Sequence, residues 1–96
     1  MGGVTTQPIT PDLVWERIAA HAGEFFRTHQ ERWFTYRIDG DVLLPSHSDS
    51  KISRAEFALA LSMLPISQPQ KLARHVSDYE HLWAVLHDKR VSEGAW

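Results

Sequence analysis

A short polar run, Ser46-His47-Ser48-Asp49, contains the residue types of a hydrolase triad. A triad needs its members to converge from separate elements in a fixed geometry, whereas neighbours in one short loop point in different directions. The sequence also lacks the Gly-x-Ser-x-Gly turn that presents a nucleophilic serine. We therefore interpret this run as a solvated turn and expect that the protein is not an enzyme.

Histidine and aspartate side chains are the other candidates for chemistry. His75, His81 and His87 follow one another at intervals of six residues, which places successive side chains about 240° apart around a helix, so they cannot share a face. The chain has no His-Glu-x-x-His spacing. Asp39 and Asp41 flank a glycine without the ligand series of a calcium loop. We expect no metal site and no cofactor.

Basic and aromatic residues gather in the middle of the chain. A strand face with arginine and aromatic rings can bind a phosphate backbone and stack bases. However, twelve acidic residues against ten basic ones give a net charge of −2, so no overall field attracts nucleic acid or an anionic membrane. A nucleic-acid-binding regulator therefore stays an alternative, with the residues Arg32, Arg37, Lys51 and Arg54 as its surface.

Residues 33–44 must position these groups, and they predict a β-hairpin. Two apolar-rich runs are divided by Asp39-Gly40, a dipeptide that favours a tight turn. If Ile38 lies opposite Asp41, one side of the hairpin is core and carries Phe34, Tyr36, Ile38 and Leu43. The other side carries Trp33, Thr35, Arg37, Val42 and Leu44. Because a lone hairpin is marginal in water, a third strand, a late helix or a partner must cover that second side.

The second side favours binding as the function. Trp33, Val42 and Leu44 are too apolar for open solvent, and aromatic residues and arginine are enriched at protein interfaces. We therefore favour a non-enzymatic interaction module that docks on another protein or self-associates as a homodimer through Trp33, Arg37, Val42 and Leu44. The competing interpretation is that one of the late helices packs there.

Helical patterns flank the hairpin. Thr10-Pro11-Asp12 predicts the start of a long helix that runs from Pro11 to about His29, and Gly23 inside it suggests close packing. Ser53 and Glu56 form a capping box with Ile52 and Phe57 as a hydrophobic staple, and this second helix should stop before Pro65.

The late part of the chain predicts one further helix and an ambiguous segment. Ser77 and Glu80 form a second capping box for a helix that ends near Asp88. Residues 66–76 fit either a short helix or a loop. If they are helical, a helix-turn-helix arrangement would use Lys71, Arg74 and His75.

These elements predict a single α+β domain. It consists of a long N-terminal helix, a β-hairpin that can extend to a three-stranded antiparallel sheet, and two or three further helices. We expect a flexible tail at residues 1–9, a compact domain at residues 10–91 and a C-terminal tail at residues 92–96. The expected core is Val14, Ile18, Phe25, Phe34, Tyr36, Ile38, Leu43, Phe57, Leu61, Leu64, Leu82, Trp83 and Leu86.

Composition fits a cytoplasmic protein. The chain of 96 residues has no cysteine, which suits a reducing compartment. No apolar run approaches the roughly 18 residues of a membrane span, so we expect no membrane partner.

Part of the chain resembles a family of small bacterial proteins. The pattern comprises Phe34-Thr35-Tyr36, Gly40-Asp41, Ile52-Ser53-Arg54 with Phe57 and Ala60-Leu61, Pro65, and Leu82 to Asp88 with Arg90. Such proteins are short, often stand alone, and occur especially in actinobacteria, with no known function. The resemblance covers roughly residues 33–91 and implies a bacterial source and a compact αββα core. It brings no site residues.

Overall fold

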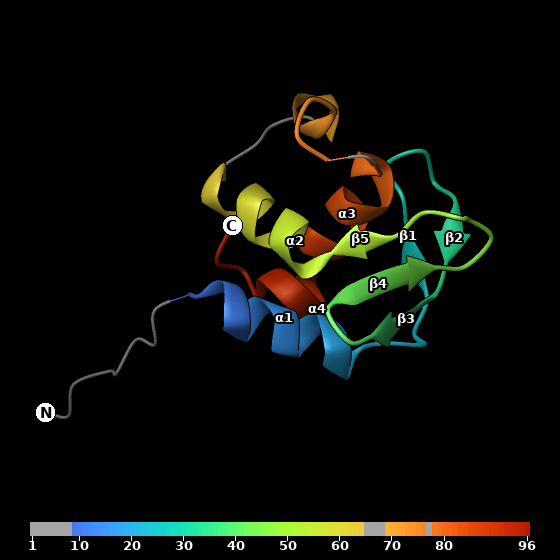
Figure 1. The fold of residues 1–96 in the computed structure, drawn as a ribbon, viewed down its shortest axis with the longest axis horizontal. Helices are drawn as coiled ribbons and strands as arrows, with labels where there is room; N and C mark the ends of the chain where they lie inside the picture. Colours follow the sequence, from blue (N-terminus) through green and yellow to red (C-terminus); the bar gives the residue numbers. More distant parts are fainter. Residues whose placement is uncertain (1–8, 65–68, 77) are drawn as a thin grey trace, which may run out of the picture.

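A computed structural model describes residues 9–64, 69–76 and 78–96 as a helix, two small sheets and further helices. In chain order the elements are α1 (Pro11–Ala20), β1 (Phe26–Arg27), β2 (Trp33–Phe34), β3 (Tyr36–Asp39), β4 (Val42–Pro45), β5 (Ile52–Ser53), α2 (Arg54–Ser62), the 3-10 turn η1 (Pro69–Leu72), α3 (Tyr79–Leu86) and α4 (Lys89–Ser92) (Figure 1). Strands β1 and β2 pair with each other, and the second sheet has the order β3-β4-β5. The α+β class and the three-stranded antiparallel sheet are confirmed.

The first helix is shorter than the sequence predicted. Its start is as expected, because the Thr10 side chain accepts a hydrogen bond from the Leu13 backbone N–H at 3.1 Å. However, α1 has ten residues and ends at Ala20, so the predicted run to His29 is wrong. Gly23 has a φ of +89°, and apart from its own atoms and those of its two chain neighbours, no heavy atom lies within 4 Å of the position that a Cβ would occupy. This glycine therefore serves a turn rather than close packing.

The chain after that turn is extended, which reverses the roles of two phenylalanines. Phe26 enters β1 and is buried, whereas Phe25 is 66% exposed. Phe25 was predicted to lie in the core because a helix would have placed it on the inner face. In a strand, neighbouring side chains point to opposite sides, so only one of the two can be buried.

The hairpin forms with a register that differs from the predicted one. Asp39 pairs with Val42 and Ile38 pairs with Leu43, so the two turn residues are Gly40 and Asp41. Gly40 has a φ of +60°, which glycine adopts without a steric cost. The partner of Ile38 moves by two residues from the expected Asp41. A shift of two keeps the side chains of β3 and β4 on their predicted sides of the sheet, whereas Trp33 and Phe34 belong to β2 in the other sheet.

The strand β5 and helix α2 follow the sequence signals closely. Ser53 accepts a hydrogen bond from the Glu56 N–H at 3.1 Å, and the Glu56 carboxylate accepts one from the Ser53 N–H at 3.2 Å. This reciprocal pair is the predicted capping box. Ile52 and Phe57, the predicted staple residues, are both buried.

The helices in the last third of the chain differ from the predicted ones in their caps and in their number. Ser77, the expected cap, lies outside the described residues, and the N-cap of α3 is Asp78, whose side chain accepts from the His81 N–H. Within the segment 66–76, residues 66–68 also lie outside the description, and η1 follows them. After α3 the chain forms a further short helix, α4, whose last residue Ser92 is the first residue of the predicted C-terminal tail. In the segment 92–96, Ser92 is buried and the Trp96 indole donates to the Leu86 carbonyl at 2.8 Å.

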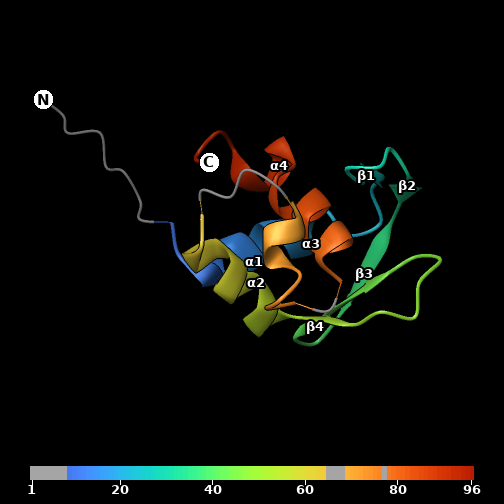
Figure 2. The same ribbon diagram turned by 90° about the horizontal axis from the view of Figure 1, so that it is seen from above.

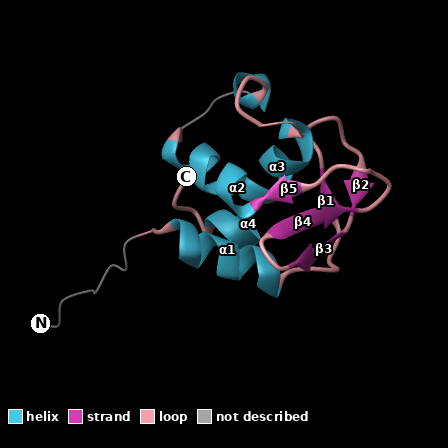
Figure 3. Ribbon diagram, in the orientation of Figure 1, coloured by secondary structure: helices cyan, strands magenta, loops and turns pink. Residues whose placement is uncertain are grey.

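The described helices gather on one side of the three-stranded sheet (Figures 2 and 3). The buried core residues come from both the helices and the strands. Four residues that were expected in the core are only partly buried and pack against the buried residues: Ile38, Leu61, Leu64 and Trp83. The fully buried core consists of Val14, Trp15, Ile18, Phe26, Phe34, Tyr36, Leu43, Ile52, Phe57, Ala60, Leu72, Val76, Leu82, Ala84, Val85, Leu86 and Val91. Among the described residues, no helix has the length and apolarity to cross a membrane.

Candidate functional site

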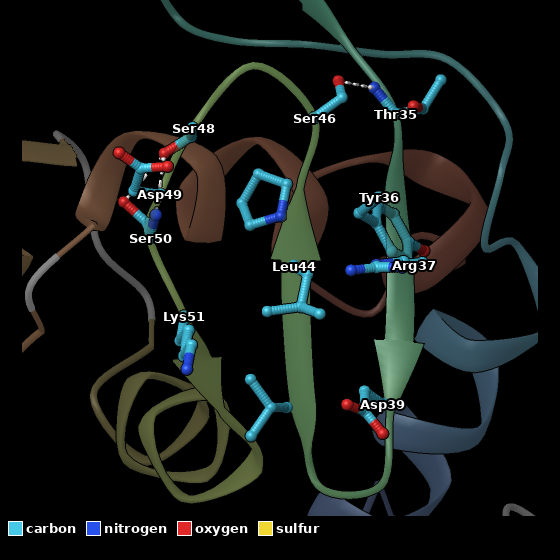
Figure 4. A pocket seen from close by; sticks show the side chains of 12 residues that line it. Thr35, Tyr36, Arg37, Asp39, Leu44, Ser46, Ser48, Asp49, Ser50 and Lys51 are labelled. Carbon is cyan, nitrogen blue, oxygen red and sulfur yellow. Dashed lines mark hydrogen bonds between the residues drawn. The ribbon is translucent and has the colours of Figure 1, made fainter.

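A groove lies on the side of strands β3 and β4 that faces away from the helices. Figure 4 looks onto this side, where β3 and β4 run next to each other and the loop of residues 46–51 passes alongside β4. The hollow has a volume of about 680 Å³. Its lining residues are Thr35, Tyr36, Arg37, Asp39, Val42, Leu44, Pro45, Ser46, Ser48, Asp49, Ser50 and Lys51. We call it the hairpin groove.

The hairpin groove combines an apolar floor with charges of both signs. Val42 and Leu44 are partly exposed on the outer side of β4, because the alternation along the strand turns Leu43 inward. Four exposed charged residues surround this floor, and none of them has an ion-pair partner within the described part of the chain: Arg37, Asp39, Asp49 and Lys51. Such a surface suits a ligand with apolar side chains flanked by charges.

The loop that forms one wall is anchored to β3. The Thr35 N–H donates to the Ser46 hydroxyl at 2.9 Å, and the Ser46 N–H donates to the Thr35 carbonyl at 2.8 Å. Further along, the Ser48 and Ser50 hydroxyls lie 2.9 Å apart in a hydrogen bond. These contacts hold the wall next to the floor before any ligand arrives, which lowers the ordering cost of binding.

The same loop does not assemble a triad. His47 has a φ of +58° and is exposed. The loop hydrogen bonds described above connect serines with each other and with Thr35, and none of those in the described residues joins His47 to Ser46, Ser48 or Asp49.

The structure brings together three of the four residues proposed for partner binding. Arg37, Val42 and Leu44 all line the hairpin groove. Trp33 does not, because it belongs to β2 in the other sheet and borders a separate hollow.

The four cations of the nucleic-acid alternative are dispersed in the same way. Arg37 and Lys51 line the hairpin groove, whereas Arg32 is exposed in the turn between β1 and β2. Arg54 is engaged by two carboxylates, with Asp12 at 2.5 Å and Asp41 at 3.6 Å. Its positive charge is therefore largely compensated within the chain.

The clearest pKa shifts belong to contacts that hold the fold together. Hydrogen bonds from Arg90 lower the pKa of Asp88 below its usual range. Burial raises the pKa of Tyr36, whose hydroxyl points away from the groove and donates to the Ile18 carbonyl. The described residues contain no group of three or more His, Cys, Asp or Glu side chains that could hold a metal ion.

Sequence reasoning identified the floor of the groove but missed its wall. The alternation of Val42 and Leu44 with Leu43 was readable from the sequence. Asp49 and the neighbouring serines have the composition of an ordinary polar loop. No local sequence signal indicated that this loop returns alongside β4.

Comparisons with protein-family models, with curated proteins and with solved structures found no match to this chain.

Proposed function

We propose that this protein is a non-enzymatic binding module that holds an extended segment of another protein in the hairpin groove. The observation that carries the proposal is the open outer side of β4, where Val42 and Leu44 are partly exposed beside an anchored loop. Apolar side chains of the partner segment would pack on these two residues.

Charge would determine the direction and selectivity of the bound segment. Arg37 and Lys51 offer cations, and Asp39 and Asp49 offer carboxylates, around one apolar floor. Oppositely charged side chains of a partner can pair with both kinds at the rim, which contributes more to specificity than to affinity. A nucleic acid would meet the two carboxylates next to its phosphates, so a protein segment is the better fit.

A peptide selection tests this function. Peptides from a random-sequence library are selected on the wild-type protein, and their Kd values are measured by calorimetry for the wild type and for V42S/L44S. We expect the double variant to weaken binding by at least about tenfold, because it removes the apolar floor. Amide chemical shifts of residues 37–51 should change when the peptide is added.

The control variant is W33A, which alters an exposed aromatic residue outside the groove and should retain the wild-type affinity. Failure to select any peptide, or equal affinity of wild type and V42S/L44S with both proteins folded by circular dichroism, would contradict the proposal.

A further inference from the structure

A second exposed surface lies on the short ribbon formed by β1 and β2. Arg27 pairs with Trp33 and Phe26 pairs with Phe34 in this ribbon. Phe26 and Phe34 are buried, so the alternation of side chains turns Phe25, Arg27 and Trp33 to the outside. We call the outer side of this ribbon, together with Glu31 in its connecting turn, the ribbon surface.

Its aromatic residues are unusually exposed. Phe25 and Trp33 are 66% and 63% accessible, more than the other large hydrophobic residues described. Both border a hollow of about 650 Å³ whose lining also includes Trp83. The Arg27 guanidinium lies 5.7 Å from the centre of the Trp33 ring, which arranges a cation beside an aromatic face. Tryptophan and arginine are the residue types that dominate binding energy at protein interfaces.

The ribbon surface carries one charged side chain of each sign. Arg27 and Glu31 are both exposed, and within the described part of the chain neither has an ion-pair partner. The turn that carries Glu31 is fixed, because the Thr28 N–H donates to the Arg32 carbonyl at 2.9 Å and the Glu31 N–H donates to the Thr28 carbonyl at 2.8 Å. A cation and a carboxylate thus extend from a ribbon whose turn is held by backbone hydrogen bonds, beside two exposed rings.

We propose that the ribbon surface is a dimerisation face that binds a second copy of this chain around a twofold axis. In such an isologous contact the same patch meets itself, so a patch with one cation and one carboxylate can complete both of its ion pairs. Arg27 of each copy pairs with Glu31 of the partner subunit, and Phe25 and Trp33 pack across the axis. The hairpin grooves are built from the other sheet and stay outside this contact.

The balance of charge selects this occupant over nucleic acid. A phosphate backbone would gain from Arg27 but would be repelled by Glu31. Asp88 and Arg90 also line the hollow, and they pair with each other at 2.8 Å. A second copy of the chain supplies both a positive and a negative side chain, Arg27 and Glu31, to the same surface. This complementarity does not depend on the proposed peptide groove.

A charge-exchange experiment tests the dimer. The wild type, R27E and E31R are each studied by sedimentation velocity from low micromolar concentration to about 1 mM. We expect the wild type to dimerise as concentration rises, and each variant alone to remain monomeric. An R27E copy carries two carboxylates at these positions and an E31R copy carries two guanidinium groups, so an equimolar mixture should form a mixed dimer.

Matched controls separate this pairing from a general effect of charge. K51E makes the same charge change in the hairpin groove, and E16R makes the opposite change on an exposed position of α1. Both should dimerise like the wild type. W33A should be monomeric while keeping its peptide affinity, which distinguishes failure here from failure of the proposed function. A monomeric wild type at the highest concentration, or a mixture of R27E and E31R that stays monomeric, would overturn the proposal.

Discussion

The Tyr36 hydroxyl donates a hydrogen bond to the Ile18 backbone carbonyl at 2.5 Å, and this buried contact joins the central hairpin to the first helix. Ile18 lies in the last turn of α1, and Tyr36 begins β3. A second link runs beside it, because the Gly23 N–H donates to the Tyr36 carbonyl at 2.9 Å. Together these bonds fix the place where the chain leaves the helix and turns towards β1.

Replacing Tyr36 with Phe should therefore destabilise the protein by about 1 to 2 kcal/mol, because the buried Ile18 carbonyl loses its tyrosine donor while the ring remains. The free energy of unfolding in urea measures the effect. Tyr79→Phe is the matched control, since Tyr79 is only partly buried and packs at the edge of the core. Equal stability of Y36F and the wild type would show that the hydroxyl contributes nothing.

Arg90 forms a second link in the fold, between α4 and the segment that leads into β1. Its guanidinium contacts the carboxylates of Asp88 at 2.8 Å and Glu24 at 2.9 Å, and it donates to the Phe25 carbonyl at 2.8 Å. It also lies 3.8 Å from the centre of the Phe26 ring.

Arg90→Lys should destabilise the fold by about 2 kcal/mol, although the charge is retained, because a lysine ammonium cannot reproduce the planar set of donors. Urea unfolding measures the loss. The exposed Arg74→Lys substitution should change stability by less than about 0.5 kcal/mol. If R90K were as stable as R74K, charge alone would explain the role of Arg90.

The sequence predicted most accurately where a local signal and the tertiary fold agree. The capping box of Ser53 and Glu56 depends only on neighbouring residues, and it formed as expected. The end of α1 depended on whether the residues after Ala20 continue as helix or become extended. Phe25 and Phe26 suit either a helix face or a strand. The turn at Gly23 and the pairing of Phe26 with Phe34, which lies in the next strand, decided for the strand. The floor of the hairpin groove was predictable because the alternation along β4 is a local signal. The position of the wall and the separation of Trp33 from Leu44 depend on how distant parts of the fold are arranged, so they were not predictable.

Asp78 should make the stability of α3 sensitive to acid. Burial alone would raise the pKa of this carboxyl, but hydrogen bonds from His81 and Ser50 outweigh it, so the pKa is lowered in the folded state. A lowered folded pKa gives stability that is present above the usual aspartate value of about 3.9 and is lost as pH falls through the folded value.

Asp78→Asn keeps a neutral cap and removes this titration. We expect D78N to be less stable than the wild type at pH 7. The difference should shrink as pH falls below the usual aspartate value of about 3.9 and the wild-type carboxyl becomes protonated. Thermal unfolding at several pH values measures the difference. A constant gap across this range would argue against a role for the charged carboxylate.

His87 should produce a separate dependence at milder pH. Its ring stacks on Trp83 with centroids 3.7 Å apart and planes inclined by 17°. Burial lowers the pKa of His87, because the charged imidazolium is poorly solvated there. The unfolded chain then binds the proton more readily than the folded one. The contribution of neutral His87 to stability is fully present above the ordinary histidine pKa of about 6.5. It declines as pH falls below that value, until the pKa of His87 in the folded state is reached.

His87→Phe preserves a ring against Trp83 and removes the titratable group. We expect H87F to lose less stability than the wild type between about pH 7.5 and pH 5.5, as measured by urea unfolding at fixed ionic strength. His29→Gln, at an exposed histidine, is the control for replacing a histidine side chain at the surface. This window lies well above the one assigned to Asp78, so the two groups can be separated in the same protein. A wild type whose stability is flat across this interval, or an H87F variant with an equally steep decline, would mean that His87 is protonated as easily in the folded chain as in the unfolded one.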